Sequence, residues 1–165
     1  MSDSFPARTP LDELADRWEA AWTGTAEDSF AACCTPDVQY EDPVAIEPVQ
    51  GAAALAAHAR RAREAFPDLR VEGTGRRVGS GECACLPWRA LGTHRGELGG
   101  LPASGWFVTI HGVHYVELQD EQVRRARGFF DLYDLGVQLG VLPARGGLGE
   151  IAMLLVRGFG IRPRA

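Results

Sequence analysis

The sequence contains no lysine, because all 17 of its basic residues are arginines. Enzymes that form a Schiff base on a lysine are therefore excluded. The patterns G-x-S-x-G, G-x-x-x-x-G-K-[ST] and G-x-G-x-x-G are also absent. A hydrolase nucleophile elbow, an NTPase phosphate loop and a dinucleotide-binding fold are thus unsupported. No apolar run reaches the roughly 20 residues that span a bilayer, and no signal peptide is recognisable at the N-terminus.

Cysteine is scarce, and its spacing is not that of a metal or redox site. The four cysteines stand in two pairs, Cys33-Cys34 and Cys83-x-Cys85, whereas zinc and dithiol sites use C-x-x-C. Buried, reduced thiols of a cytoplasmic protein are the simpler interpretation. The pattern His111-x-x-His114 falls on a predicted strand and lacks the helix and glutamate of a zinc protease. No metal is therefore expected.

Charge and length narrow the class of protein further. The net charge of -5 disfavours a nucleic-acid partner, because polyanions are usually bound by a basic face. At 165 residues a single domain is expected, with its core at about residues 10–143 and a C-terminal extension at 144–165. A chain of this length buries enough surface for one sizeable core with a cavity inside it.

Three helices are predicted before the main run of strands. The first begins at Pro10 with Thr9 as its N-cap and ends at Gly24. A short second helix is expected at residues 26–34, and an alanine-rich third helix at 51–66. The apolar stripe of the first helix recurs at helical spacing and consists of Leu11, Leu14, Ala15, Trp18 and Trp22.

The remainder of the core predicts a sheet. A short strand is expected at residues 38–42, where side chains alternate in polarity before Pro43. Long strand-like segments joined by short turns follow at 69–78, 83–95, 105–118 and 123–133. Such consecutive strands favour a curled, mostly antiparallel sheet. We therefore expect an α+β fold shaped as a cone, whose wide end holds a small-molecule pocket.

The end of the chain predicts a helical tail. One helical turn is expected at residues 134–140, before Pro143, and residues 147–165 carry an apolar face. The simplest interpretation is a helix that packs on the sheet or on a second subunit. A lid over the pocket and a membrane-surface segment are the alternatives.

Residues 40–51, Tyr-Glu-Asp-Pro-Val-Ala-Ile-Glu-Pro-Val-Gln-Gly, resemble the ketosteroid isomerases. The equivalent segment of those enzymes carries the general-base aspartate, which corresponds to Asp42. The two oxyanion donors of the isomerases do not match, since Trp18 replaces a tyrosine and no carboxyl group stands near His111 or His114. An indole N–H donates a hydrogen bond but does not release its proton at neutral pH. Ketosteroid isomerase activity itself is therefore not predicted.

Other stretches resemble the SnoaL-like polyketide cyclases of the same NTF2-like superfamily. The matching residues are Ala-Phe-Pro-Asp-Leu at 65–69, Trp88, Gly-Thr-His-Arg-Gly at 92–96, Pro-Ala-Ser-Gly at 102–105, Phe130-Asp131, Gln-Leu-Gly at 138–140 and Pro143. The whole resemblance extends from about residue 11 to 143. It implies an NTF2-like cone-shaped barrel with three N-terminal helices, usually dimeric, with an apolar cavity. It also implies neither a metal nor an organic cofactor.

Asp42 is the first candidate for acid–base chemistry. The resemblance to the isomerases implies that it removes a proton from a carbon next to a carbonyl group. Near Tyr40, Trp18 and Trp22, loss of solvent would raise the pKa of this carboxylate and strengthen it as a base. The alternative is a turn aspartate whose side chain holds backbone amides before Pro43.

Asp131 and His94 are the other candidate catalytic residues. The resemblance to the cyclases implies that Asp131 is the acid–base group of an intramolecular aldol closure. Its alternative role is the N-cap of the following turn, for which Asp134 competes. His94 is predicted to donate a hydrogen bond to a developing enolate or to orient Asp131, and its alternative role is structural.

The remaining histidines are assigned from their spacing. His111 and His114 are separated by an odd number of positions on one strand, so their side chains face opposite sides of the sheet. His111 is preferred as the residue that points into the pocket. His58 neighbours Arg60 and Arg61 on the third predicted helix and is interpreted as a surface residue.

These assignments lead to one functional hypothesis and two alternatives. The leading hypothesis is a cofactor-independent enzyme that cyclises, isomerises or dehydrates a hydrophobic carbonyl compound such as a polyketide intermediate. The alternatives are water addition of the epoxide-hydrolase type, with Arg89 or Arg127 beside an aspartate, and non-catalytic binding of an apolar ligand. A homodimer is expected. The predicted substrate-binding residues are Trp18, Trp22, Tyr40, Trp88, Trp106, His111 and Phe130.

Overall fold

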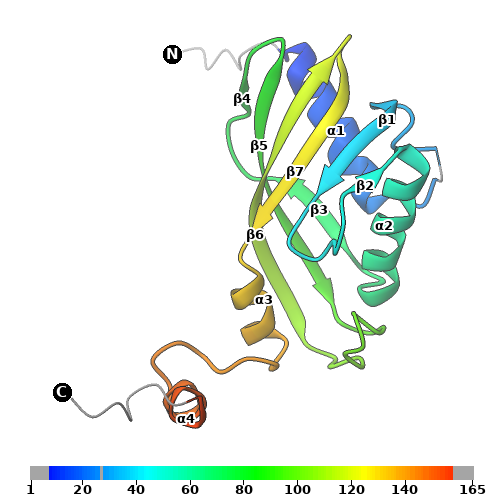
Figure 1. The fold of residues 1–165 in the computed structure, drawn as a ribbon. Coiled ribbons are helices and arrows are strands. Elements are labelled where there is room, and N and C mark those ends of the chain that lie inside the picture. Colours follow the sequence, from blue (N-terminus) through cyan, green and yellow to red (C-terminus); the bar gives the residue numbers. More distant parts are fainter. Residues whose placement is uncertain (1–7, 27, 158–165) are drawn as a thin grey trace, which may run out of the picture.

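The computed structural model describes residues 8–26 and 28–157 and shows an α+β fold (Figure 1). Helices α1 (Pro10–Thr23) and α2 (Ala52–Ala65) contribute to the same apolar core on one face of a sheet. The strands are β1 (Cys34–Glu41), β2 (Val49–Gln50), β3 (Arg70–Gly73), β4 (Val78–Gly79), β5 (Cys83–Thr93), β6 (Phe107–Gln119) and β7 (Gln122–Phe130). The predicted fold class is thus confirmed.

The sheet is mixed and open. Its strand order is β2-β1-β7-β6-β5-β3, with β4 paired to β5. The pairs β5–β6, β6–β7, β3–β5, β4–β5 and β1–β2 are antiparallel, whereas β1 runs parallel to β7. Strands β2 and β3 are the edge strands at the two ends of this order and do not pair with each other. The expected closure into a cone-shaped barrel is therefore not confirmed.

The first helix forms as expected, but the second does not. Thr9 and Asp12 make a capping box at the start of α1, and Gly24 follows its end. The prediction of a helix at residues 26–34 is wrong, because the described residues of this segment form turns and Cys34 already belongs to β1. The carbonyl oxygen of Cys33 accepts a hydrogen bond from the amide of Val123 at 2.9 Å. Pairing with β7 therefore prevails over local helix propensity.

The core between α1, α2 and the sheet is rich in aromatic rings. Trp18 is completely buried and lies with its ring centroid 5.6 Å from that of Phe30 and 5.9 Å from that of Trp22. Tyr40 from β1 contacts the same group, 5.1 Å from Trp22. Edge-on and tilted ring pairs of this kind add stability beyond the area they bury. They also hold Trp22 and Tyr40, which line the cavity described below.

Two further helices follow the last strand of the sheet. Helix α3 (Leu132–Gln138) begins two residues before the predicted turn at 134–140. Helix α4 (Leu148–Val156) contains no buried residue and lies apart from the sheet in Figure 1. The expected packing of the tail on the sheet is therefore not observed for α4. Residues 158–165 of the predicted tail lie outside the described residues.

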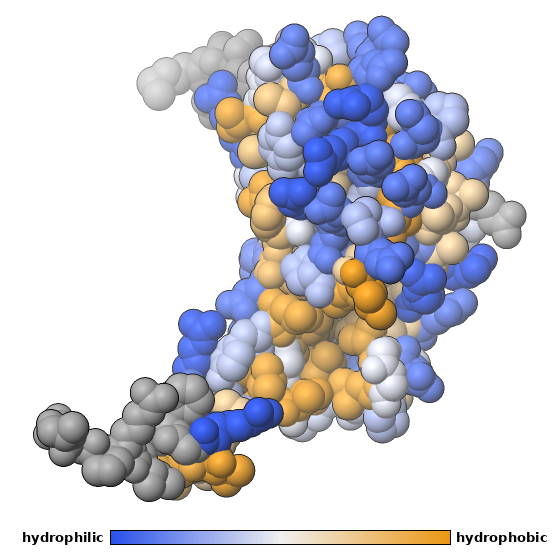
Figure 2. Space-filling view, in the orientation of Figure 1, coloured by the Kyte–Doolittle hydropathy of each residue, from blue (hydrophilic) through white to orange (hydrophobic). Residues whose placement is uncertain are grey.

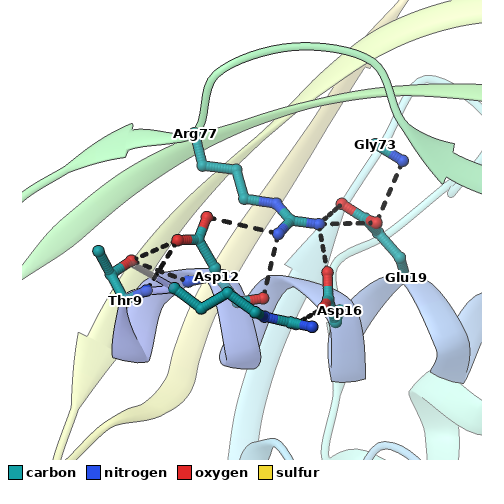
Figure 3. Close-up of polar contacts among 7 residues, drawn as sticks. Thr9, Asp12, Asp16, Glu19, Gly73 and Arg77 are labelled. Carbon is teal, nitrogen blue, oxygen red and sulfur yellow. Dashed lines mark hydrogen bonds and ion pairs between the residues drawn. The ribbon is translucent and has the colours of Figure 1, made fainter. Parts of the chain in front are cut away.

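An ion-pair cluster joins α1 to the segment between β3 and β4 (Figure 3). The Arg77 guanidinium donates to Asp16 at 2.6 Å, to both Glu19 carboxylate oxygens at 3.1 Å and to the Asp12 carbonyl at 3.1 Å. Glu19 also accepts from the amide of Gly73 at 3.1 Å. Arg77 and Glu19 are only 15% and 11% exposed, so water screens this pair less than an ordinary surface pair.

Candidate active site

An apolar cavity of about 130 Å³ lies between α2 and the covered face of the sheet, and reaches α3 and the loop after β5. Figure 2 shows apolar side chains gathered on the lower half of the molecule, below α2 in the view of Figure 1. The lining consists of Trp22, Tyr40, Asp42, Val44, His58, Ala62, Phe66, Leu69, Val71, Trp88, Ala90, Leu98, Ile110, His114, Phe130 and Leu135. Such an apolar wall with few polar groups is typical of small-molecule sites.

Asp42 lies at the end of β1, and its side chain is only 4% exposed. One carboxylate oxygen, Oδ1, accepts hydrogen bonds from the amides of Val44 at 2.9 Å and Ala45 at 2.7 Å. The other, Oδ2, lies 2.8 Å from Nε2 of His58. The two roles considered for Asp42 therefore coexist, because the carboxylate holds the turn after β1 and also lines the cavity.

His58 is the residue that the sequence interpretation missed. It is buried on α2 rather than exposed, so its assignment to the surface is wrong. Arg61, which has only donors, contacts Nδ1 at 3.2 Å. This contact leaves the proton on Nε2, which donates to Asp42. The apolar stripe Leu55, His58 and Ala59 on α2 has helical spacing and could have revealed the buried position.

Opposing effects act on the acidity of Asp42. Burial acts to raise the pKa of the carboxyl group, but its hydrogen bonds with His58 and with the amides of Ala45 and Val44 outweigh this effect. The pKa of Asp42 is consequently lower than its ordinary value. Burial and, to a smaller extent, the Asp42 carboxylate raise the pKa of Tyr40 well above its usual value, so the phenol keeps its proton. Asp42 is thus an ionised, relatively weak base.

Gly128 on β7 allows three polar side chains to meet at the end of the cavity. A Cβ atom at this position would lie 2.7 Å from Oη of Tyr40, 3.3 Å from Cβ of Asp42 and 3.4 Å from Cδ2 of His114. The first distance is too short for an ordinary contact with a rigid ring substituent. The absence of a side chain at residue 128 therefore lets the phenol, carboxylate and imidazole lie side by side.

His114 on β6 faces the cavity as a neutral imidazole. Its Nδ1 accepts a hydrogen bond from Nε1 of Trp18 at 3.1 Å, which places its proton on Nε2. Burial lowers the pKa of His114 to about 3, against the attraction of the Asp42 charge. The ring stacks on Trp22 at 5.7 Å and on Trp88 at 5.1 Å between centroids. His114 can therefore donate a hydrogen bond near neutral pH, but it cannot supply a positive charge.

The prediction that His111 points inward is wrong. His114 is 3% exposed and lines the cavity, whereas His111 is exposed on the other face of the sheet. The sequence predicts that side chains alternate between the two faces of β6, but it does not predict which face is covered by helices. Strand parity separates two sets of side chains without saying which set the helices cover.

The other predicted site residues are divided between the cavity and other regions. Trp22, Tyr40, Trp88 and Phe130 line the cavity, while Trp18 lies behind the lining and reaches it through His114. Trp106 is 61% exposed and is not among the lining residues. His94 is fully buried, 5.3 Å from Phe66 between ring centroids. Its Nδ1 accepts from the amide of Ser104 at 3.1 Å, so it contacts a loop rather than either candidate aspartate.

Asp131 is the N-cap of α3. Its side chain accepts a hydrogen bond from the amide of Asp134 at 2.9 Å, is 56% exposed and lies 3.8 Å from Arg145. Together with His111 it lines a separate, more polar hollow beside α3. The structure thus brings Asp42 together with His58 and His114, but not with Asp131 or His94.

The arrangement is suited to moving a proton within an apolar enclosure. A carboxylate with a histidine partner can accept and return a proton, and the neutral imidazole can donate a hydrogen bond to a nearby oxygen. Among residues 8–26 and 28–157, no group of three histidine, cysteine or acidic side chains is placed to hold a metal ion. The helices in this part of the chain are too short or too polar to cross a membrane.

Solved structures with the same fold were found at low sequence identity. A proposed SnoaL-like polyketide cyclase from Jannaschia sp. CCS1 is 24% identical, with a TM-score of 0.72 over 87% of this chain and 100% of the other. TsrD from Streptomyces laurentii is 24% identical, with a TM-score of 0.73 over 84% and 100%. A protein with a ketosteroid isomerase-like fold from Catenulispora acidiphila, in complex with trimethylamine, is 17% identical, with a TM-score of 0.68 over 78% and 93%.

Comparison with protein families gives a more specific result. No curated protein matches the chain. The SnoaL-like polyketide cyclase family matches residues 12–139, which include most of α1, all of α2, every strand of the sheet and both histidines beside Asp42. Since this match covers well over half of the sequence, the chain belongs to the family of SnoaL-like polyketide cyclases.

Proposed function

We propose that this chain is a cofactor-independent acid–base enzyme that cyclises, isomerises or dehydrates a hydrophobic carbonyl compound, with a polyketide intermediate as the best-suited substrate. The observation that carries the proposal is the nearly buried Asp42 carboxylate, paired with His58, in the wall of an apolar cavity. Membership of the cyclase family supports a reaction of this class. Asp42 would take a proton from a carbon next to the carbonyl group and return it to another atom of the product.

The low pKa of Asp42 favours one kind of substrate. A weak base removes a proton efficiently only from a comparatively acidic carbon. Carbons that lie between two activating groups, as in 1,3-dicarbonyl compounds, are more acidic than those of simple ketones. A ligand that fills the apolar cavity would also remove water from Asp42 and so raise the pKa of the carboxyl group. Poly-β-ketone chains fit both requirements.

Hydrogen exchange on 2-tetralone tests the proposal without the natural substrate. The C1 hydrogens of this hydrophobic ketone lie between a carbonyl group and an aromatic ring, and NMR follows their replacement by deuterium from solvent. The wild-type protein is expected to accelerate this exchange well above buffer and above an equal concentration of an unrelated protein. If 2-tetralone binds in the cavity and its exchange is not accelerated, the proposed activity is contradicted.

A His58→Leu variant tests whether His58 affects catalysis through Asp42 or has only a structural role. Without the hydrogen bond of His58, the pKa of Asp42 is expected to rise, so a larger fraction of the carboxyl group is protonated at low pH. The ratio of the exchange rate at pH 5 to that at pH 8 should therefore be lower in His58→Leu than in the wild type. The pH–rate profile checks this shift. An unchanged profile in a folded variant would show that His58 does not act through Asp42.

Binding without catalysis is the second candidate function, and one observation favours it. Asp42 already accepts two amide hydrogen bonds and pairs with His58, as a purely structural carboxylate would.

Water addition of the epoxide-hydrolase type has less support. Arg89 pairs with Glu72 and Arg127 with Glu41, each at 2.8 Å, and neither arginine is among the cavity residues.

We also propose that the chain acts as a homodimer in the cytoplasm. Phe107 and Phe129 are each more than half exposed, and strand alternation places them on the face of the sheet opposite the cavity. Helix α4 adds further exposed apolar side chains. Such exposed apolar side chains are candidates for burial against a second copy of the chain. Light scattering coupled to gel filtration should give twice the mass of one chain, and a monomer at micromolar concentration would contradict the proposal.

A further inference from the structure

His58 contacts one charged group at each of its two ring nitrogens. Its Nε2 lies 2.8 Å from Oδ2 of Asp42, and its Nδ1 lies 3.2 Å from Nη2 of Arg61. The side chains of His58 and Asp42 are only 9% and 4% exposed, whereas Arg61 is an exposed residue of α2. The imidazole is therefore held between a buried carboxylate and a guanidinium at the surface.

The two charged groups act on the imidazole in opposite directions. A carboxylate beside the ring favours its doubly protonated, cationic form, because opposite charges attract. A guanidinium disfavours that form, because it repels a second positive charge. It also has only donors, so it cannot accept a hydrogen bond from a protonated Nδ1. The contact of Arg61 with Nδ1 thus bears on whether Asp42 has a neutral or a cationic partner.

The neighbouring groups do not replace either charge. The other rings beside His58 belong to Trp22 and Tyr40, whose centroids lie 6.1 and 5.7 Å away. Neither ring is charged, since the phenol of Tyr40 keeps its proton. None of the ion pairs formed within residues 8–26 and 28–157 includes Arg61. The guanidinium charge is therefore not neutralised by a carboxylate of these residues.

We propose that Arg61 is a positioning residue that keeps His58 neutral, with its single proton on Nε2, so that Asp42 pairs with an uncharged donor instead of an imidazolium. The proposal rests on the proposed function only for its consequence in catalysis. A cationic partner lowers the proton affinity of a carboxylate more than a neutral hydrogen-bond donor does. Arg61 therefore preserves the strength of Asp42 as a base, although Arg61 itself is not among the cavity residues.

NMR of the ¹⁵N-labelled, ligand-free full chain measures the protonation of His58 directly, with its signals assigned from their loss in His58→Leu. At pH 7 the wild type is expected to carry a proton on Nε2 and none on Nδ1. In Arg61→Met the ratio of protonated to unprotonated Nδ1 should rise about threefold to tenfold, because Asp42 is then the only charged neighbour. Arg61→Lys keeps a positive charge and should stay closer to the wild type.

Exchange of the C1 hydrogens of 2-tetralone measures the consequence for Asp42. A cationic His58 makes the carboxylate a weaker base, so the exchange at pH 7 should be about threefold to tenfold slower in Arg61→Met than in the wild type. Arg60→Met is the matched control, because it removes the same charge from the next position of α2. The Arg60 side chain is 60% exposed and lies 3.7 Å from Glu64, so both measurements should equal those of the wild type.

A protonated Nδ1 in the wild type at pH 7 would overturn the proposal, as would an unchanged Nδ1 in a folded Arg61→Met variant or an equal response to Arg60→Met. The expected NMR change with an unaltered exchange rate would show that Arg61 does not act on catalysis. If the wild type fails to accelerate the exchange while Nδ1 responds to Arg61→Met as expected, the proposed activity is wrong and the effect of Arg61 on His58 stands.

Discussion

An Asp42→Asn variant is expected to exchange the C1 hydrogens of 2-tetralone about 10²–10⁴-fold more slowly than the wild type. Asparagine has nearly the same shape as aspartate but cannot accept the proton. It also has only one oxygen, whereas Asp42 accepts from two backbone amides on Oδ1 and from His58 on Oδ2. One donor must therefore face an NH₂ group, which should lower the free energy of unfolding by about 1–3 kcal/mol. Deuterium exchange and urea denaturation measure the two effects separately.

Asp131→Asn is the matched control for this substitution. Asp131 caps α3 through the amide of Asp134 and does not line the Asp42 cavity. Asparagine is as good an N-cap as aspartate, so both the exchange rate and the stability should stay close to wild type. If the rate instead falls in Asp131→Asn and persists in Asp42→Asn, the catalytic assignment made for Asp42 is wrong.

Replacement of Arg77 with methionine is expected to lower the free energy of unfolding by about 2–3 kcal/mol at pH 8. The guanidinium contacts Asp16 and Glu19 in a partly buried cluster (Figure 3), and loss of one partner leaves the Glu19 charge without compensation. Complete burial would make the loss larger, about 3–5 kcal/mol, but solvent reaches Asp16, whose side chain is 43% exposed. Urea denaturation followed by circular dichroism measures the change.

The effect of Arg77→Met should depend on pH in a defined direction. Burial raises the pKa of Glu19 above its ordinary value, although Arg77 acts against this, and removal of the arginine raises the pKa further. A carboxyl group whose pKa is higher in the folded state binds more protons there, so stability falls as pH rises. The loss should therefore be largest at pH 8 and smaller near pH 5.

Arg89→Met provides a control at an exposed ion pair. Arg89 and Glu72 are 45% and 39% exposed, and pairs of this kind contribute about 0–1 kcal/mol. Equal effects of the two substitutions would mean that the Arg77 cluster contributes no more than a surface ion pair.

The sequence could predict Asp42 but not the residues around it. The E-D-P run and the alternation before Pro43 identified a strand end with a carboxylate. His58 was hidden by the neighbouring Arg60 and Arg61, whose charges indicate a surface, although a helix turns each residue by about 100° and can bury a single position between exposed ones. His114 could not be distinguished from His111, because strand parity does not reveal which face α1 and α2 cover.

The fold was predictable where local signals and tertiary packing agree. Thr9, Pro10 and Gly24 mark the limits of α1 correctly because capping is a local effect. The segment at residues 26–34 has no comparable local signal, and its course depends on β7, which lies far away in the sequence. The role of Asp131 was likewise not decided by the sequence, which allowed both a catalytic group and an N-cap. The structure shows that Asp131 caps α3.

The parallel pairing of β1 with β7 has a consequence for how the protein acquires its site. Tyr40 pairs with Ala126 and Glu41 with Arg127, so the strand that precedes Asp42 can take its place only when the last strand of the sheet is available. Closing so long a loop is entropically unfavourable, and folds dominated by such distant pairings form in milliseconds to seconds rather than microseconds. During synthesis, strands β3 to β6 can pair before β7 is made. Strand β1, which precedes Asp42, can join these strands only after β7 has been made. A chain that ends before β7 would therefore contain Asp42 but would lack both the strand that pairs with β1 and the Phe130 side chain that lines the cavity.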